Sequence, residues 1–131
     1  MLETTSGAAA GPQLTGQHRE LLDQVLDKWS LQILDTLCEH GPLRFNSLRR
    51  AIPVITQKSL TTALRRLERN GMIARDITNT RPVAVEYRLT PLGRSLQDLI
   101  DALLHWATST LPEVERARAH FDRQSAQGDA R

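Results

Sequence analysis

The chain has 131 residues, of which 40% are hydrophobic and 24% charged, and its 17 basic and 15 acidic side chains leave a net charge of +2. A chain of this length and composition can bury one core of useful size, so we expect a single compact domain with frayed ends. It has no run of about 18 apolar residues that could span a bilayer, and its N-terminus lacks the basic-then-apolar order of a secretory signal. These features argue against an integral membrane protein and predict a cytoplasmic one.

The first segments are an arm and a helical region. Residues 1–16 are rich in Gly, Ala, Thr and Ser with almost no large apolar side chains, which predicts a disordered arm. Apolar side chains then recur with helical spacing over residues 17–37. We interpret this region as one helix, or as two helices broken near Asp27. The Gly41-Pro42 pair ends it, because proline cannot continue the hydrogen-bond ladder.

Two further helices follow in close succession. Residues 45–51 show the spacing of a short amphipathic helix, and Pro53 ends it. Thr56 is a favourable N-cap for the next helix, which the Asn70-Gly71 pair closes. Its apolar stripe consists of Leu60, Leu64 and Leu67. A short helix, a turn and a second helix form the pattern of a helix-turn-helix.

A pair of strands is predicted next. Residues 72–77 and 83–89 alternate apolar and polar side chains with the period of two that is typical of strands. Residues 78–82 would form the tip of this hairpin. The order of elements therefore predicts a mainly α fold with a small β-hairpin wing, a winged helix-turn-helix.

The chain after the hairpin is predicted to be helical and to pair with a second copy. Thr90 can cap a helix, and Pro91 can occupy its first position, where a missing N–H costs nothing. The apolar stripe that follows is broader than one small domain can cover, which predicts dimerisation through the terminal helices. The expected interface residues are Leu96, Leu99, Ile100, Leu103, Leu104 and Trp106.

Charge increases after Pro112, where we expect a solvated helix to about Gln124 and then a loose tail. The expected organisation is a disordered arm over residues 1–16, a winged helix-turn-helix domain with its dimerisation helices over residues 17–111, and a charged C-terminal helix and tail over residues 112–131.

Positive charge is concentrated on the helix-turn-helix. Residues 44–69 hold seven basic side chains and one acid, Glu68, which leaves 10 of the 17 basic and 14 of the 15 acidic side chains for the rest of the chain. In a helix-turn-helix the second helix enters the major groove, where Gln pairs with adenine, Lys or Arg with guanine, and the Thr methyl group with the thymine methyl group. The candidates for base reading on that helix are Gln57, Lys58, Thr61, Thr62 and Arg65.

Other basic residues are candidates for contacts with the DNA backbone. The expected phosphate contacts are Arg49, Arg50 and Arg66. Arg81 on the wing could enter a narrow minor groove or contact phosphate alone, and the sequence leaves both open. The plain alternative to all these assignments is a solvated helix face that happens to be basic.

Other chemistry finds little support in the sequence. Cys38 is the single cysteine, so no intramolecular disulfide can form, and it is interpreted as a small packed side chain. Cys38 and His40 are two residues apart and point in different directions on a helix, so they make no metal pair. No Gly-rich phosphate loop, catalytic triad or cofactor fingerprint is present, and we expect neither an enzyme nor a metal or cofactor. Trp29 and Trp106 are interpreted as core or interface residues, although aromatic side chains beside a dimer seam could also line a pocket for a small-molecule effector.

Several segments in order resemble the HxlR family of bacterial winged helix-turn-helix regulators, within the broader MarR-like group. The similar segments are residues 27–34 (DKWSLQIL), 41–50 (GPLRFNSLRR), 56–61 (TQKSLT), 64–73 (LRRLERNGMI) and 85–93 (VEYRLTPLG). The resemblance covers about residues 18–108. It implies a homodimer paired through terminal helices that regulates transcription at its own or a nearby promoter.

The chain departs from the family pattern at two places. Members of the family often carry a sensing cysteine just before the first helix, but the equivalent position here is Gly16, so the resemblance implies no thiol sensing there. The glycine pair that usually precedes the Lys/Arg-Trp motif is replaced by Leu26-Asp27. The turn between the first two helices is therefore expected to differ from that of the family.

The sequence thus predicts a homodimeric, sequence-specific DNA-binding regulator. A small chain acts most simply by occluding polymerase, which favours a repressor, and two symmetric DNA-binding heads favour an inverted-repeat operator. The alternative function is that of a winged-helix protein–protein adaptor that binds an acidic partner without reading DNA sequence. A small-molecule-binding protein or enzyme is a third possibility.

Overall fold

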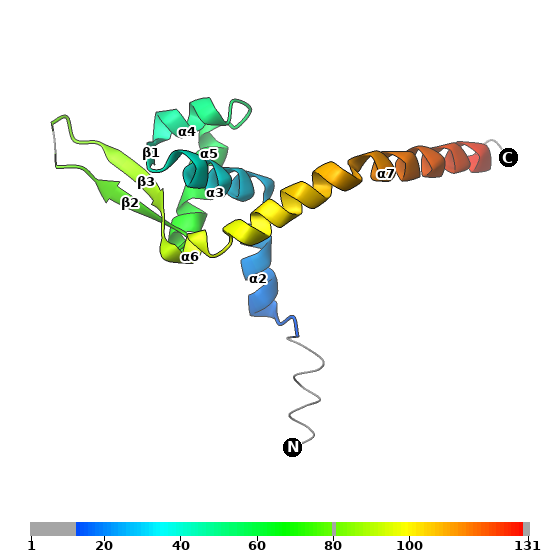
Figure 1. Cartoon of the computed structure of the whole chain (residues 1–131), viewed down its shortest axis with the longest axis horizontal. Coiled ribbons are helices and arrows are strands. Elements are labelled where there is room, and N and C mark those ends of the chain that lie inside the picture. The colour runs from blue at the N-terminus through cyan, green and yellow to red at the C-terminus, as the bar shows by residue number, and fades with distance from the viewer. Residues whose placement is uncertain (1–12, 80, 130–131) are drawn as a thin grey trace, which may run out of the picture. The chain divides into compact units, whose positions relative to one another are not determined.

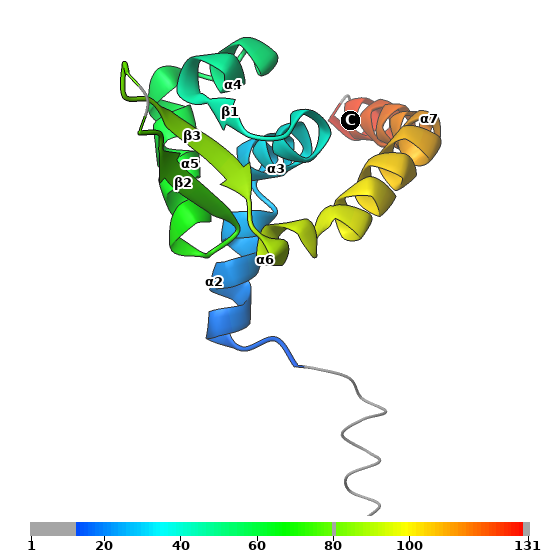
Figure 2. The same ribbon diagram turned by 60° about the vertical axis from the view of Figure 1, so that its left-hand side comes forward.

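Two helices begin the described part of the chain. The computed structural model describes residues 13–79 and 81–129, and the chain divides into two compact units between Ser95 and Leu96 (Figures 1 and 2). Helices α2 (Gly16–Val25) and α3 (Lys28–His40) are separate. Of the two predicted alternatives, one helix or two, the structure therefore has two. The second begins after Asp27, whose carboxylate caps it by accepting hydrogen bonds from the backbone N–H groups of Trp29 and Ser30 at 3.1 and 3.3 Å.

The arm expected over residues 1–16 lies mostly outside the described residues. Of the part that is described, Gly16 already belongs to α2, and the Thr15 hydroxyl caps that helix by accepting a hydrogen bond from the His18 N–H at 3.3 Å. The helix therefore begins slightly earlier than the composition of the arm indicates.

The predicted helix-turn-helix is confirmed. Helix α4 (Phe45–Ala51) precedes a turn and helix α5 (Gln57–Arg69). The Thr56 hydroxyl caps α5 by accepting a hydrogen bond from the Ser59 N–H at 3.0 Å. Gly71 follows α5 with a φ of 76°, in the left-handed region that glycine adopts at little cost.

The wing is part of a three-stranded antiparallel sheet, one strand more than the predicted hairpin. Strands β1 (Leu43–Arg44), β2 (Ile73–Ile77) and β3 (Val85–Leu89) lie in the order β1-β3-β2. Strand β1 has only two residues, too few to show an alternating pattern, and it exists through its pairing with β3. The sequence therefore offers no local signal for it.

The register of the hairpin assigns its side chains to two faces. Ile73 pairs with Leu89 and Arg75 with Tyr87, so these four side chains share one face. Ile73 and Leu89 are buried on it, whereas Ile77 farther along β2 is 61% exposed. The side chains on this face are therefore buried at the base of the hairpin and exposed toward its tip.

The core of the first unit lies between α3, α4, α5 and the sheet. Its fully buried large side chains are Ile33, Leu34, Leu37, Leu48, Leu60, Leu64, Leu67 and Ile73. Each such side chain contributes roughly 1.5–3 kcal/mol by its removal from water. The complete burial of the leucine stripe of α5 fixes the rotation of that helix, and hence which of its side chains face outward.

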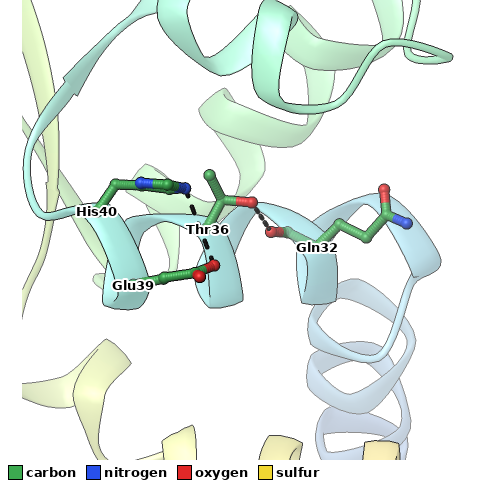
Figure 3. A network of polar contacts seen from close by, with 4 residues as sticks. All are labelled: Gln32, Thr36, Glu39 and His40. Carbon is green, nitrogen blue, oxygen red and sulfur yellow. Dashed lines mark hydrogen bonds and ion pairs between the residues drawn. The ribbon is translucent and has the colours of Figure 1, made fainter.

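One side of α3 is polar and remains outside the core (Figure 3). The Thr36 hydroxyl donates a hydrogen bond to the Gln32 carbonyl at 2.7 Å, and the His40 Nε2 lies 3.8 Å from a Glu39 carboxylate oxygen. Cys38 on the same helix is a free, half-buried thiol.

A short helix closes the base of the wing. Helix α6 (Pro91–Arg94) starts at Thr90, whose hydroxyl accepts a hydrogen bond from the Gly93 N–H and donates one to the Gly71 carbonyl. Gly93 packs so closely on the backbone of Met72 that a Cβ atom there would lie 2.0 Å from the Met72 carbonyl oxygen. The single helix predicted from Thr90 onward is wrong, because the chain turns after α6 before the next helix begins.

The second unit consists of helix α7 (Gln97–Asp129), which continues through Pro112. The hydroxyls of Thr108, Ser109 and Thr110 each donate a hydrogen bond to the carbonyl four residues earlier, a pattern that bends helices without ending them. The helix extends past Gln124, so the loose tail expected there is helical as far as the structure describes it. The limits of the expected domains stay a prediction.

Several expected interface residues are exposed on α7. Leu99 and Leu104 are each 50% exposed and Trp106 is 61% exposed. Leu103 is also exposed, Leu96 is half-buried and Ile100 is buried. Their pairing with a second copy stays a prediction.

Candidate nucleic-acid interface

The outward side of α5 carries all five predicted base-reading residues. Because the leucine stripe faces the core, the side chains of Gln57, Lys58, Thr61, Thr62 and Arg65 are all exposed. The Thr56 cap orders the first turn of the helix, where two of these five residues lie. A helix presented in this way can enter a major groove, which is about 12 Å wide.

A groove of about 490 Å³ runs along the side of α5 that faces the sheet. Three of the predicted base-reading residues line this groove, and they are spaced four residues apart along α5: Gln57, Thr61 and Arg65. Its lining consists of Gln57, Thr61, Leu64, Arg65 and Glu68 from α5, Phe45 from α4, and Arg75 and Tyr87 from the sheet. The wing strands and the recognition helix therefore share one concave surface.

A second hollow, of about 250 Å³, lies on the other side of α5 against the start of α3. Its lining consists of Lys58, Ser59, Thr62, Ala63 and Arg66 from α5, and Asp27 and Trp29 at the start of α3. Lys28 lies over the Trp29 ring with its ammonium 4.7 Å from the ring centre. The structure thus divides the predicted base-reading set into a row facing the sheet and a row facing α3.

The basic side chains of α5 form no ion pairs within the part of the chain that the structure describes. Among the described residues, no ion pair involves Lys58, Arg65, Arg66 or Arg69. The acidic residue of this helix, Glu68, does form an ion pair. Its carboxylate lies 3.8 Å from the Nε of Arg75 on β2. Four cations on one helix that form no ion pair with a described residue present a positive surface that can neutralise phosphates.

The predicted phosphate contacts occupy different environments. Arg49 and Arg50 are exposed on α4 and line a shallow hollow with Asn46 and Pro53, where an Arg50 Nη donates a hydrogen bond to the Ser47 hydroxyl at 3.3 Å. Arg66 is half-buried on the α3 side of α5. Arg81 is exposed at the tip of the wing.

Two basic residues of this surface were not assigned from the sequence. Arg69 is exposed seven residues after Thr62 and four after Arg65, so the helical spacing alone could have indicated it. Arg75 could not be found in this way, because its place in the groove depends on the register of β2 with β3 and on the packing of the sheet against α5.

Other kinds of site find no support in the described residues. No group of three or more His, Cys, Asp or Glu side chains comes together there in a way that could hold a metal ion. No helix in the described ranges is long and apolar enough to cross a bilayer.

Comparison with known proteins agrees with the fold. The model of the HxlR-like helix-turn-helix family matches residues 24–115. The chain belongs to this family. The match spans the helix-turn-helix, the wing and the first part of α7, so the resemblance seen in the sequence is confirmed.

Relatives of this HxlR-family chain include uncharacterized HTH-type transcriptional regulators from distant bacteria. YtcD of Bacillus subtilis (strain 168) is 42% identical over 93 residues, which are 71% of this chain and 73% of that protein. YtfH of Escherichia coli (strain K12) is 40% identical over 100 residues, which are 76% of this chain and 79% of that protein.

Solved structures of similar proteins share the fold. The putative transcriptional regulator ytfH from Salmonella typhimurium matches with a TM-score of 0.69 and 38% identity over 77% of this chain and 89% of that one. The reduced form of the redox regulator HypR matches with a TM-score of 0.68 and 35% identity over 75% of this chain and 96% of that one. This HxlR-family chain is a DNA-binding helix-turn-helix regulator of transcription and not an enzyme.

Proposed function

We propose that this HxlR-family protein is a sequence-specific transcriptional repressor that binds an inverted-repeat operator as a homodimer in the cytoplasm. The observation that carries the proposal is the outward face of α5, where Gln, Thr, Lys and Arg side chains are exposed and, among the described residues, Lys58 and Arg65 form no ion pair. Gln and Arg provide the bidentate hydrogen bonds that distinguish adenine and guanine in the major groove. A merely solvated face would not need side chains of these types, and the exposed Arg49 and Arg50 of α4 and Arg81 of the wing add cations that can contact phosphate.

Dimerisation is supported by the exposed apolar side chains of α7. Leu99, Leu104 and Trp106 are each at least half exposed, and large apolar side chains exposed on one helix are stabilised when a second copy covers them. A two-fold axis between two copies presents two α5 helices to DNA. The half-sites of the operator would then be about one helical turn, roughly 34–36 Å, or a multiple of it apart.

Repression is the simplest mode of action for such a dimer. Bound across a promoter, it would block polymerase by occupying the same DNA, and this requires nothing beyond the DNA-binding surface described above. A small-molecule effector that changes DNA affinity is compatible with this role.

The experiment is a fluorescence-anisotropy titration at about 150 mM salt with the chain's own upstream intergenic duplex and with a shuffled duplex of the same composition. The expected result is binding to the upstream duplex at least roughly 10³-fold more tightly than to the shuffled one, the range of specific regulators. If the operator lies elsewhere in the genome, selection of bound duplexes from a random-sequence pool would identify the preferred sequence. If no duplex in the pool is preferred, sequence-specific binding is excluded and the protein–protein adaptor becomes the better account.

A further inference from the structure

Glu68 is an unusual residue for its position. Residues 44–69 hold seven basic side chains, and Glu68 is the single acid in this segment. It is exposed on the helix that is proposed to bind DNA. A carboxylate on such a face repels phosphate, so its presence calls for a contact that outweighs this cost. The contact that the structure shows is with Arg75 on β2.

The ion pair contributes little to the stability of the free protein. The Glu68 Oε2 and Arg75 Nε atoms are 3.8 Å apart, and the two side chains are 42% and 47% exposed. Exposed pairs of this kind typically contribute about 0–1 kcal/mol.

The position of the pair indicates another role. Arg75 stands opposite Tyr87 on the face of the hairpin that lines the groove, and the same groove holds Arg65 of α5. The guanidinium of Arg75 faces Glu68 through Nε. Among the described residues no hydrogen bond engages the Arg75 guanidinium, so its N–H donors, including those of the two terminal nitrogens, can bind a second anion.

We propose that Arg75 contacts a phosphate of the DNA backbone from this groove, and that Glu68 is a positioning residue that holds the Arg75 guanidinium toward it. The inference rests on the proposed DNA-binding function. Glu68 fixes one side of the fork, and the phosphate is recognised by the other, in the bidentate geometry that guanidinium and phosphate groups favour. The pair also links the recognition helix to the second strand of the sheet, so the wing and α5 would engage the duplex in one fixed relation.

The sheet offers a matched control pair on its opposite face. The Arg88 Nε donates a hydrogen bond to an Asp76 carboxylate oxygen at 2.6 Å, a closer contact than that of Arg75 with Glu68, and the side chains of Arg88 and Asp76 are 45% and 49% exposed. Their register partners, Ala74 and Glu86, alternate with Arg75 and Tyr87, so Arg88 points away from the groove. Loss of Arg88 removes the same charge from the same sheet without touching the proposed contact.

The test measures how strongly salt weakens binding to a fluorescent duplex of about 30 bp and random sequence, between about 50 and 200 mM salt. Phosphate contacts do not depend on sequence, so no operator is needed. For each bound copy, Arg75→Gln should reduce the slope of log K against log salt by about 0.9, while Arg88→Gln should leave it at the wild-type value. Equal slopes for wild type and Arg75→Gln, or equal reductions in both variants, would overturn the phosphate contact.

The positioning role of Glu68 is tested by a double-mutant cycle on the same slopes. In a Glu68→Gln background, Arg75→Gln should reduce the slope by clearly less than in the wild-type background, because the guanidinium is no longer held. An equal reduction in both backgrounds would refute positioning. Thermal melting of each variant verifies that it is folded. A wild-type chain that binds no duplex would refute the proposed function and this inference together, whereas normal wild-type binding with an unchanged Arg75→Gln slope would refute the inference alone.

Discussion

Replacing Gly93 with alanine should strongly destabilise the first unit. A Cβ atom at this position would lie 2.0 Å from the Met72 carbonyl oxygen and 2.9 Å from the Met72 carbonyl carbon. Both are backbone atoms, which cannot rotate away as a flexible side chain can. The Met72 carbonyl also accepts a hydrogen bond from the Thr90 N–H at 3.1 Å, directly before α6.

The size of the effect follows from these distances. A non-bonded contact needs about 3.5 Å, so α6 and the Met72 backbone must separate by roughly 1.5 Å. Such a shift costs about 1–3 kcal/mol as overpacking, and loss of the hydrogen bond from Thr90 adds about 1–3 kcal/mol. The expected decrease in the free energy of unfolding is therefore about 2–6 kcal/mol. At about 4 °C per kcal/mol this lowers the melting temperature by roughly 8–24 °C.

Thermal unfolding followed by far-ultraviolet circular dichroism measures this decrease. Gly16→Ala is the matched control, because a Cβ atom at Gly16, in the first turn of α2, meets nothing within 4 Å. That variant should melt at or slightly above the wild-type temperature, since alanine is favoured over glycine in a helix by roughly 0.5–1 kcal/mol. A Gly93→Ala protein that melts within about 2 °C of wild type would show that the packing of α6 on Met72 is not as close as the structure has it.

Three further predictions concern DNA binding and assembly. Arg65→Ala should cost about 1–3 kcal/mol on the preferred duplex and relax base preference, as read by anisotropy, while an equal loss on shuffled DNA would reassign Arg65 to phosphate. Thr56→Ala removes the cap of α5 and should cost about 1 kcal/mol in thermal unfolding, with a loss of sequence discrimination. An unchanged melting temperature would contradict this role of the cap. Leu104→Glu should convert a dimer to a monomer in sedimentation experiments, because burying an unpaired charge costs on the order of 3 kcal/mol. His105→Glu, about one-quarter turn farther round α7 and away from the stripe, should leave the dimer intact, and a Leu104→Glu dimer would place the interface elsewhere.

Much of the first unit could be predicted because its signals are local. The leucine spacing of α5, its Thr56 cap and the Asn70-Gly71 stop all lie within one short segment, and the helix begins and ends where they indicate. The same holds for α4, whose bounds match the predicted residues 45–51. Helix propensity and capping act over a few residues, so a single sequence contains most of the information they need.

The candidate site was predictable only in part. The exposed side of α5 follows from the burial of its leucine stripe, and helical spacing placed its outward residues correctly on that side. Their division between the groove beside the sheet and the hollow beside α3 did not follow, because it depends on what packs against each flank of the helix. Spacing determines which side chains share a face, and the neighbouring elements determine what that face meets.

The sequence by itself determined the order of helices and strands, the cap of the recognition helix and the concentration of positive charge on it, since each of these depends on residues close together in the chain. Only the tertiary structure decided the strand β1, the close packing of Gly93 on Met72 and the place of Arg75 beside Glu68. Each of these depends on how separate helices and strands pack together, which the spacing within one element does not show. A two-residue strand is stabilised by its partner, a glycine is required by the carbonyl packed against it, and the ion pair forms where strand β2 packs against helix α5.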